Sequence, residues 1–75
     1  MDKKAIGKRL IELRGSRTQN EVAQAIGISV AAVGMYERGE RIPRDEIKVK
    51  LAVFYGKTVS EIFFDKNDTP SVSKA

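Results

Sequence analysis

The sequence predicts an all-α domain, built as a compact bundle of five short helices, and three observations support this prediction. Apolar residues recur at helical spacing in five stretches, and no stretch alternates apolar and polar residues in the manner of a strand. A glycine or a proline follows or precedes most of these stretches, as expected where helices end or begin. The chain has 75 residues, which suffices for one domain with a small core.

The first helix is expected over residues 2–13, because Ile6, Leu10 and Leu13 then share one face while basic residues occupy the others. An aspartate at its start can cap the first turn, where a negative charge also suits the helix dipole. Gly15 follows the last apolar residue of the pattern and should end the helix.

Residues 18–39 form the segment on which the functional hypothesis depends. Two short helices, over residues 19–26 and 29–38, meet at a tripeptide that contains Gly27 and Ser29. The glycine can end the first helix in a left-handed conformation, and the serine can cap the second. Two helices joined by so short a turn must cross steeply, which is the geometry of a helix-turn-helix unit.

Two further helices complete the expected bundle. Pro43 sets the start of the fourth helix within the next two residues, and Gly56 closes it. Thr58 can cap a last helix over residues 59–64, with a glutamate at the capping-box position. The apolar residues of both helices then form stripes that can pack on the first three.

The ends of the chain differ from its centre. We expect one domain over residues 1–64 and a disordered tail over residues 65–75, which offer little that a core could bury. The N-terminus is charged, and no run approaches the roughly 18 apolar residues that a membrane span requires. The sequence therefore predicts a soluble cytoplasmic protein with no membrane partner.

The positive charge is unevenly distributed. The net charge of +4 lies entirely in residues 1–44, which also hold all six arginines, whereas residues 45–75 are neutral. Arginine is a good donor to phosphates and base edges, because its planar guanidinium presents several N–H groups in a fixed fork. This asymmetry favours a polyanionic partner. The alternative is an ordinary solvated surface whose charges serve no partner.

Two residue types that carry much of enzyme chemistry are missing. The chain has no cysteine and no histidine, which excludes a disulfide framework, a thiolate metal site, a cysteine nucleophile and the commonest general base. The carboxylates that neighbour arginines lie at helix starts or in a connector, where capping and surface pairing explain them. We therefore expect a protein that is not an enzyme and that uses no metal and no cofactor.

Positions spread over residues 6–64 resemble the Cro/phage-repressor type of helix-turn-helix transcriptional regulators. The matching positions are Thr18-Gln19, Val22-Ala23, Gly27-Ile28-Ser29, Val33, Tyr36-Glu37-Arg38-Gly39, Pro43, Leu51-Ala52, Tyr55-Gly56 and Ser60-Glu61-Ile62. The resemblance implies a lambda-repressor-like DNA-binding domain with its helix-turn-helix at residues 18–38. It further implies a bacterial or phage-encoded, nucleoid-associated repressor that binds a double-stranded DNA operator, commonly as a homodimer.

Carried over to these positions, the resemblance implies three groups of DNA contacts. They are residues that meet phosphates near helix N-termini, residues of the second helix that face base edges, and arginines that run along the DNA backbone. The full set is Arg17, Thr18, Gln19, Ser29, Val30, Ala31, Ala32, Gly34, Met35, Arg38, Arg41 and Arg44. Within it, Gln19 and Ser29 are expected on phosphates, and Arg38 along the DNA backbone.

Two features depart from the family pattern. The connector before Thr18 is shorter than usual, which leaves open whether Arg14 pairs with Glu37 as a structural ion pair. The expected reading surface, from Val30 to Met35, contains no Gln, Asn, Arg or Lys, the residues that normally read guanine and adenine. We expect apolar contacts to thymine methyl groups instead. The alternative is that these side chains pack inward.

Gly34 lies within this apolar surface. It would allow the protein backbone to approach DNA closely, at a cost of roughly 1 kcal/mol of helix propensity relative to alanine. Since base-edge donors are missing, phosphate contacts should dominate the affinity, and binding should depend steeply on salt. Specificity would then rest on operator shape and on two half-sites about one helical turn apart.

The C-terminal part of the domain carries more apolar surface than a small core requires. We expect Val53, Phe54, Phe63 and Phe64 to form a homodimer seam, with a lid over the fourth helix as the alternative. An antitoxin of the same fold, which grips a toxin, and a non-DNA interaction module are the competing functions. A protein antirepressor is a further partner that would control so small a repressor.

Overall fold

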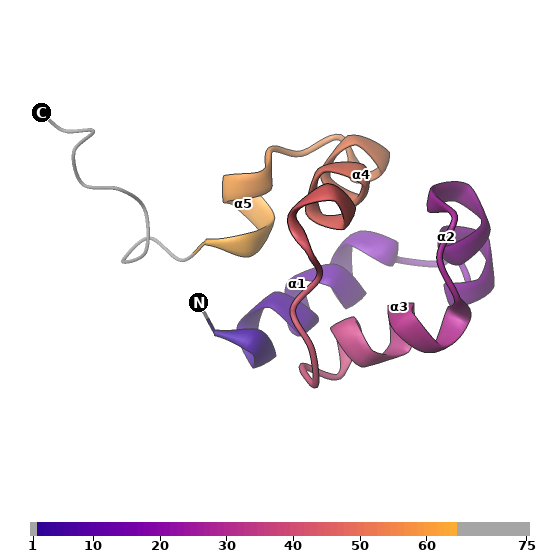
Figure 1. The fold of residues 1–75 in the computed structure, drawn as a ribbon, viewed down its shortest axis with the longest axis horizontal. Helices are drawn as coiled ribbons and strands as arrows, with labels where there is room; N and C mark the ends of the chain where they lie inside the picture. Colours follow the sequence, from indigo (N-terminus) through magenta and orange to yellow (C-terminus); the bar gives the residue numbers. More distant parts are fainter. Residues whose placement is uncertain (1, 65–75) are drawn as a thin grey trace, which may run out of the picture.

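The computed structural model describes residues 2–64, and this part of the chain is all-α, as predicted (Figure 1). No residue in this range is in a β-strand. The helices are α1 (Lys3–Arg14), α2 (Gln19–Ile26), α3 (Val30–Glu37), α4 (Asp45–Tyr55) and α5 (Val59–Phe63). Their ends differ from the predicted ends by no more than one residue. The predicted tail, residues 65–75, lies outside the described residues.

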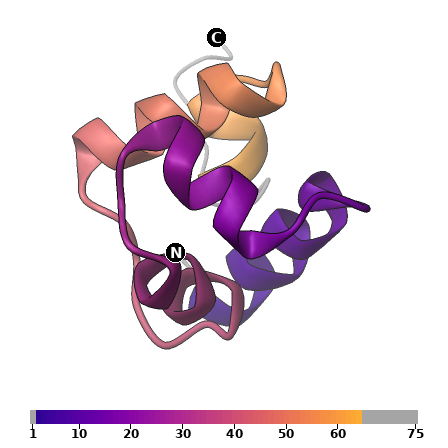
Figure 2. The ribbon, with the colours of Figure 1, turned by 90° about the vertical axis from the view of Figure 1, so that its right-hand side faces the viewer.

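The helices pack around one core. α1 crosses the middle of the molecule and contacts α3 on one side and α5 on the other (Figure 1). α2 lies between α3 and α4, as the view turned by 90° shows (Figure 2). All five helices contribute to the core, which consists of Ile6, Leu10, Val22, Ala23, Ile26, Val33, Ile47, Leu51, Ala52, Ile62 and Phe63. The helix-turn-helix is therefore supported from behind by α1 and α4.

Side-chain caps begin the helices where the sequence predicts them. The hydroxyl of Thr18 accepts the backbone N–H of Glu21 at 3.0 Å, and the Glu21 carboxylate accepts the N–H of Thr18 at 2.8 Å. Thr58 and Glu61 repeat this capping box at α5. At the start of α3, Ser29 Oγ accepts a backbone N–H at 3.0 Å. These bonds satisfy N–H groups that a helix leaves unpaired in its first turn.

Two glycines in the left-handed conformation direct the chain out of α2 and α3. Gly27 has a φ of 73° and Gly39 a φ of 74°. The N–H after each glycine donates to a carbonyl oxygen of the last helical turn, at 3.0 Å after Gly27 and at 2.9 Å after Gly39. Both helices thus end in the same hydrogen-bonded motif, as the sequence predicts. The turn between α2 and α3 is short because this motif ends α2 at Gly27 and Ser29 already caps α3.

α1 and α3 approach each other closely at Gly7, a residue that the sequence analysis does not single out. A Cβ atom at this position would overlap the carbonyl oxygen of Glu37 and lie 2.9 Å from its carbonyl carbon. Those atoms are backbone and cannot move aside as the end of a side chain can. Glycine is therefore required for this crossing, and the crossing holds the last turn of α3 against α1.

The prediction that Phe63 lies in a dimer seam is wrong. Its side chain is 1% exposed and belongs to the core, with the Nζ atom of Lys48 5.9 Å from the ring centroid. The core takes up one of the two adjacent aromatic rings, because α5 packs on both α1 and α4. Phe64 follows α5 in an extended conformation and is half-buried. A seam containing Phe63 would require the core to open.

Candidate nucleic-acid interface

A buried polar junction joins the first three helices. The side chain of Glu37, in the last turn of α3, is only 4% exposed. Its carboxylate accepts Nε and Nη2 of Arg14 from α1, at 2.7 and 3.1 Å, and Nε2 of Gln19 from α2, at 2.9 Å. A buried carboxylate requires such donors, because burial removes its water. The short connector therefore does permit the ion pair that the sequence left open.

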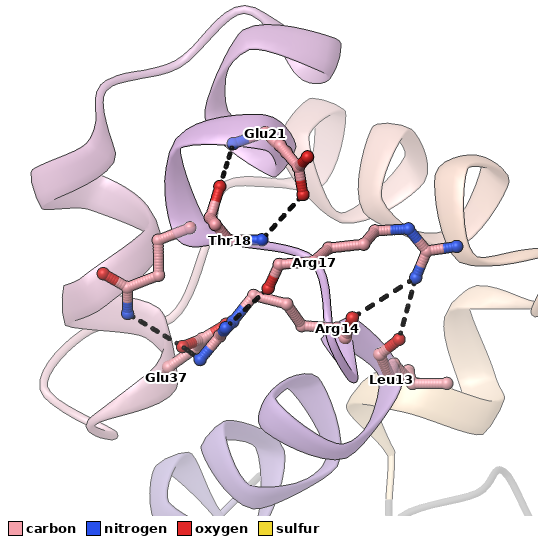
Figure 3. A network of polar contacts seen from close by, with 7 residues as sticks. Leu13, Arg14, Arg17, Thr18, Glu21 and Glu37 are labelled. Atoms are coloured by element: carbon pink, nitrogen blue, oxygen red, sulfur yellow. Dashed lines mark hydrogen bonds and ion pairs between the residues drawn. The ribbon is translucent and has the colours of Figure 1, made fainter.

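Arg14 also holds the connector between α1 and α2. Its Nη1 atom donates to the carbonyl oxygen of Arg17 at 2.8 Å (Figure 3). The hydrogen bonds that Arg14 donates to Glu37 raise the pKa of its guanidinium, which stays charged. One guanidinium thus connects α1, the connector and α3. Through the connector it also sets where α2 begins, and Gln19 is the first residue of that helix.

The structure assigns Arg17 a role other than the expected DNA contact. Its Nη1 atom donates to the carbonyl oxygen of Leu13 at 3.2 Å, at the end of α1. Its guanidinium also lies 5.2 Å from the ring centroid of Phe54 and 5.8 Å from that of Tyr55, both in α4. Figure 3 shows the guanidinium extending away from Glu37. The side chain is engaged with α1 and α4 while the residue stays exposed, and a DNA contact by Arg17 stays a prediction.

The solvent-facing side of α3 is apolar, as predicted. Val30 is 41% exposed, and Ala31 is also exposed, whereas Met35 is half-buried. Val33 and Tyr36 occupy the opposite side and pack on the core. The alternative that the reading surface packs inward is therefore wrong for the first turn of the helix. These side chains offer methyl and methylene groups and no side-chain hydrogen-bond donor.

Gly34 differs from the expectation, because it is covered. The guanidinium of Arg38 folds back over it, so that a Cβ atom on Gly34 would lie 2.8 Å from Arg38 Nη1. The same guanidinium donates from Nε and Nη2 to the carboxylate of Glu40, at 2.9 and 3.3 Å. This hydrogen-bonded pair lowers the pKa of Glu40. A close approach of DNA to Gly34 would thus meet Arg38 first.

The remaining expected contacts lie around the ends of α2 and α3. Thr18 and Ser29 are exposed and cap these helices, and Gln19 is half-buried against Glu37. A shallow hollow beside α3 is lined by Ile28, Ala32, Tyr36, Arg41, Ile42, Arg44 and Ile47. Ala32 therefore faces this hollow rather than the outermost side of α3. Both arginines at its rim are exposed, so cationic groups border the helix-turn-helix on the side of the α3–α4 connector.

The exposed apolar surface lies only partly where the sequence places it, because it includes Val53 and Phe54 but not Phe63. Val53 is 75% exposed and Val49 52% exposed, both on α4. Together with Ala25, Ile26, Lys50 and Phe54 they line a hollow between α2 and α4. Val49 and Val53 stand four residues apart and off the inward stripe of α4, a signal that the sequence analysis could have used. The expected seam residues Val53 and Phe54 thus face α2 as their neighbour, not α5.

Comparison with known proteins gives one match. The model of a family described as helix-turn-helix matches residues 8–62, which include all of α2, α3 and α4. Searches among curated proteins and among solved structures return no match. Among the described residues, no helix has the length and apolar character needed to cross a membrane, and no cluster of three acidic, cysteine or histidine side chains could hold a metal ion.

Proposed function

Since this chain belongs to the helix-turn-helix family of Cro/C1-type DNA-binding regulators, we propose that it represses transcription by binding a double-stranded DNA operator through α3. The observation that carries the proposal is the exposed apolar side of α3, bordered by capped helix starts and exposed arginines. α3 lies in the major groove, with α2 across the backbone.

Phosphates are bound from both sides of α3. Gln19 uses one amide N–H to hold Glu37 and retains a second N–H for a phosphate. Ser29 accepts a backbone N–H, so its own hydroxyl proton is available to donate. Arg41 and Arg44 supply charge on the other side. Neutralising two phosphates per protomer gives a slope of about −2 in log K against log salt, and about −4 for a dimer.

Base edges are contacted mainly by apolar groups. Val30, Ala31 and Met35 recognise thymine methyl groups in the major groove, because they lack a side-chain N–H or O–H to offer to guanine or adenine. Such contacts discriminate modestly between sequences. We therefore expect part of the specificity to come from operator shape, through the energy needed to fit the DNA to the protein.

The protein binds as a homodimer through the apolar face formed by Val49, Val53 and Phe54 with Ala25. This proposal replaces the seam that included Phe63. Two exposed valines at helical spacing beside a half-buried phenylalanine leave an apolar face that a second copy would cover. To bind two half-sites one helical turn apart, the dimer would have to hold its two copies of α3 about 34 Å apart.

Sedimentation velocity at micromolar concentration tests the dimer. The wild type should sediment as a dimer, and Val53→Glu should sediment as a monomer with unchanged helical circular dichroism. Ser60→Glu, at an exposed position of α5 outside this hollow, is the matched control for the added charge. A wild type that is monomeric both alone and on DNA would contradict the dimer without affecting the DNA-binding proposal.

Selection of bound sites from a random duplex library tests the proposed function itself. The expected result is one enriched sequence, arranged as an inverted repeat with half-site centres about 10 base pairs apart. Arg41→Ala should lower affinity for every duplex alike and reduce the salt slope by about 1 per protomer, or about 2 for the dimer. A library that stays unenriched after repeated rounds would contradict sequence-specific binding and would favour an interaction module without a DNA target.

A further inference from the structure

We propose that Arg38 reads a guanine within the operator, with Gly34 and Glu40 as the residues that orient it. The inference rests on the proposed operator binding and deepens it, because it adds a base-specific donor to a reading surface that is otherwise apolar. The sequence analysis expects Arg38 along the DNA backbone. The geometry points to the base edges instead.

Gly34 makes room for the guanidinium on the reading side of α3. A Cβ atom at this position would lie 2.8 Å from Nη1 of Arg38, 3.6 Å from Cζ and 3.7 Å from Nη2. Gly34 is buried under this group, although the neighbouring Val30 and Ala31 on the same side are exposed. Arg38 therefore reaches back by one helical turn and lies level with the residues that face base edges.

One edge of the guanidinium is fixed and another is available. Nε and Nη2 donate to the two carboxylate oxygens of Glu40, at 2.9 and 3.3 Å. No hydrogen bond among residues 2–64 uses Nη1. Nη1 and the second N–H of Nη2 form a parallel pair of donors, the arrangement that binds O6 and N7 of guanine. The side chain is 59% exposed, so DNA can reach it.

Glu40 also explains why the target is a base and not a phosphate. Its carboxylate lies beside the guanidinium and would repel a phosphate, and it cancels the charge that draws arginine to the DNA backbone. The edge of guanine is uncharged and offers two acceptors, so the same carboxylate does not oppose it. By contrast, the structure gives no ion pair to Arg41 in the described part of the chain, and Nη2 of Arg44 lies 3.7 Å from a carboxylate oxygen of Glu46, beyond hydrogen-bond distance.

Binding-site selection with Arg38→Lys, compared with Arg41→Lys, tests this assignment. Lysine keeps the charge and loses the fork. We expect Arg38→Lys to lose a guanine preference at one position of each half-site, by about 5- to 150-fold, while other positions keep theirs. Arg41→Lys should preserve every preference. Gly34→Ala supplies an independent variant, because its methyl group displaces the guanidinium and should weaken the same guanine preference.

Each outcome of this comparison bears on the inference. An Arg38→Lys protein that binds all sequences more weakly, with every base preference intact, would overturn it and return Arg38 to the DNA backbone. A wild type with no base preference at all would overturn the proposed function, and this inference with it. Circular dichroism of each variant establishes that the selection was made with folded protein.

Discussion

Two arginine–glutamate pairs lie next to each other at the end of α3, and they have different roles. Glu37 pairs inward with Arg14, at 2.7 Å, and its side chain is 4% exposed. Arg38 pairs outward with Glu40, at 2.9 Å, and the side chain of that glutamate is 52% exposed. The chemical groups and the distances are nearly the same, but the inward carboxylate is buried, joins two helices and also accepts Nε2 of Gln19, whereas the outward pair is exposed and joins residues two positions apart.

The difference assigns a role to each pair. An inward carboxylate has lost its water and depends on its donors, so the Arg14–Glu37 pair fixes how α1 and α3 meet. An outward pair is solvated and screened, so it contributes little to folding, and here it leaves the Nη1 edge of the guanidinium available to DNA. Two consecutive residues, the last of α3 and the one that follows it, thus serve stability and recognition respectively.

The largest expected effect comes from removing the inward carboxylate. Glu37→Ala should lower the free energy of unfolding by about 3 kcal/mol, since it leaves the guanidinium of Arg14 and the amide of Gln19 without their acceptor. Urea denaturation followed by circular dichroism measures this loss. Glu40→Ala is the matched control and should leave the midpoint unchanged. Equal losses in both variants would contradict the division between the pairs.

A smaller loss of stability is expected from a substitution where α1 and α3 cross, the contact that positions Glu37. Gly7→Ala should destabilise the fold by about 2 kcal/mol, because the added methyl group meets the backbone of α3. Gly34→Ala makes the same substitution against the movable end of Arg38 and should be neutral or stabilising. Thermal unfolding of both variants measures the difference. A stable Gly7→Ala protein would show that the crossing tolerates a wider separation.

A substitution in the outward pair should change the affinity for DNA and leave the stability of the fold unchanged. Glu40→Gln removes a negative charge beside the DNA surface, so affinity for non-specific duplex should rise by about two- to fivefold at low salt. Fluorescence anisotropy with a labelled duplex measures it, alongside an unchanged unfolding midpoint. Glu12→Gln, on α1, gives the matched change in net charge at an exposed position elsewhere. The same rise in both variants would indicate a net-charge effect only.

The smallest expected effect is a pH dependence at Glu40. The hydrogen bond from Arg38 lowers the pKa of the Glu40 carboxyl below its ordinary value of 4.5. A lowered pKa in the folded state means that the contribution to stability is present above pH 4.5 and is lost as the pH falls through the folded-state pKa. A carboxyl NMR titration should show the lowered value, and Arg38→Ala should return it toward 4.5. An unchanged titration in that variant would contradict the pairing.

Much of the fold follows from local sequence signals. The capping boxes at Thr18 and Thr58 and the glycine at position 27 act within a few residues, so their pattern can be read along the chain. The inward face of α4 follows from its helical periodicity. Gly7 could not be assigned in this way, because its reason lies in the backbone of α3, 30 residues further along the chain.

The sequence predicts which residue types form the candidate site better than it predicts where their side chains point. The apolar side of α3 follows from the residues between Val30 and Met35, which include no long polar side chain. The directions of the Arg17 and Arg38 side chains cannot be predicted from the sequence, since a flexible side chain points toward partners that only the tertiary structure supplies. Phe54 and Tyr55 attract the Arg17 side chain, and Glu40 attracts the Arg38 side chain, for which Gly34 leaves room because it has no Cβ atom.

The central claim is that the surface of α3 recognises one DNA sequence. The most direct measurement is competition between the selected operator and a scrambled duplex of equal length, for the wild-type protein at fixed salt. We expect the operator to be preferred by about a thousandfold or more, the usual margin of specific over non-specific binding. Equal competition by the two duplexes would contradict the claim.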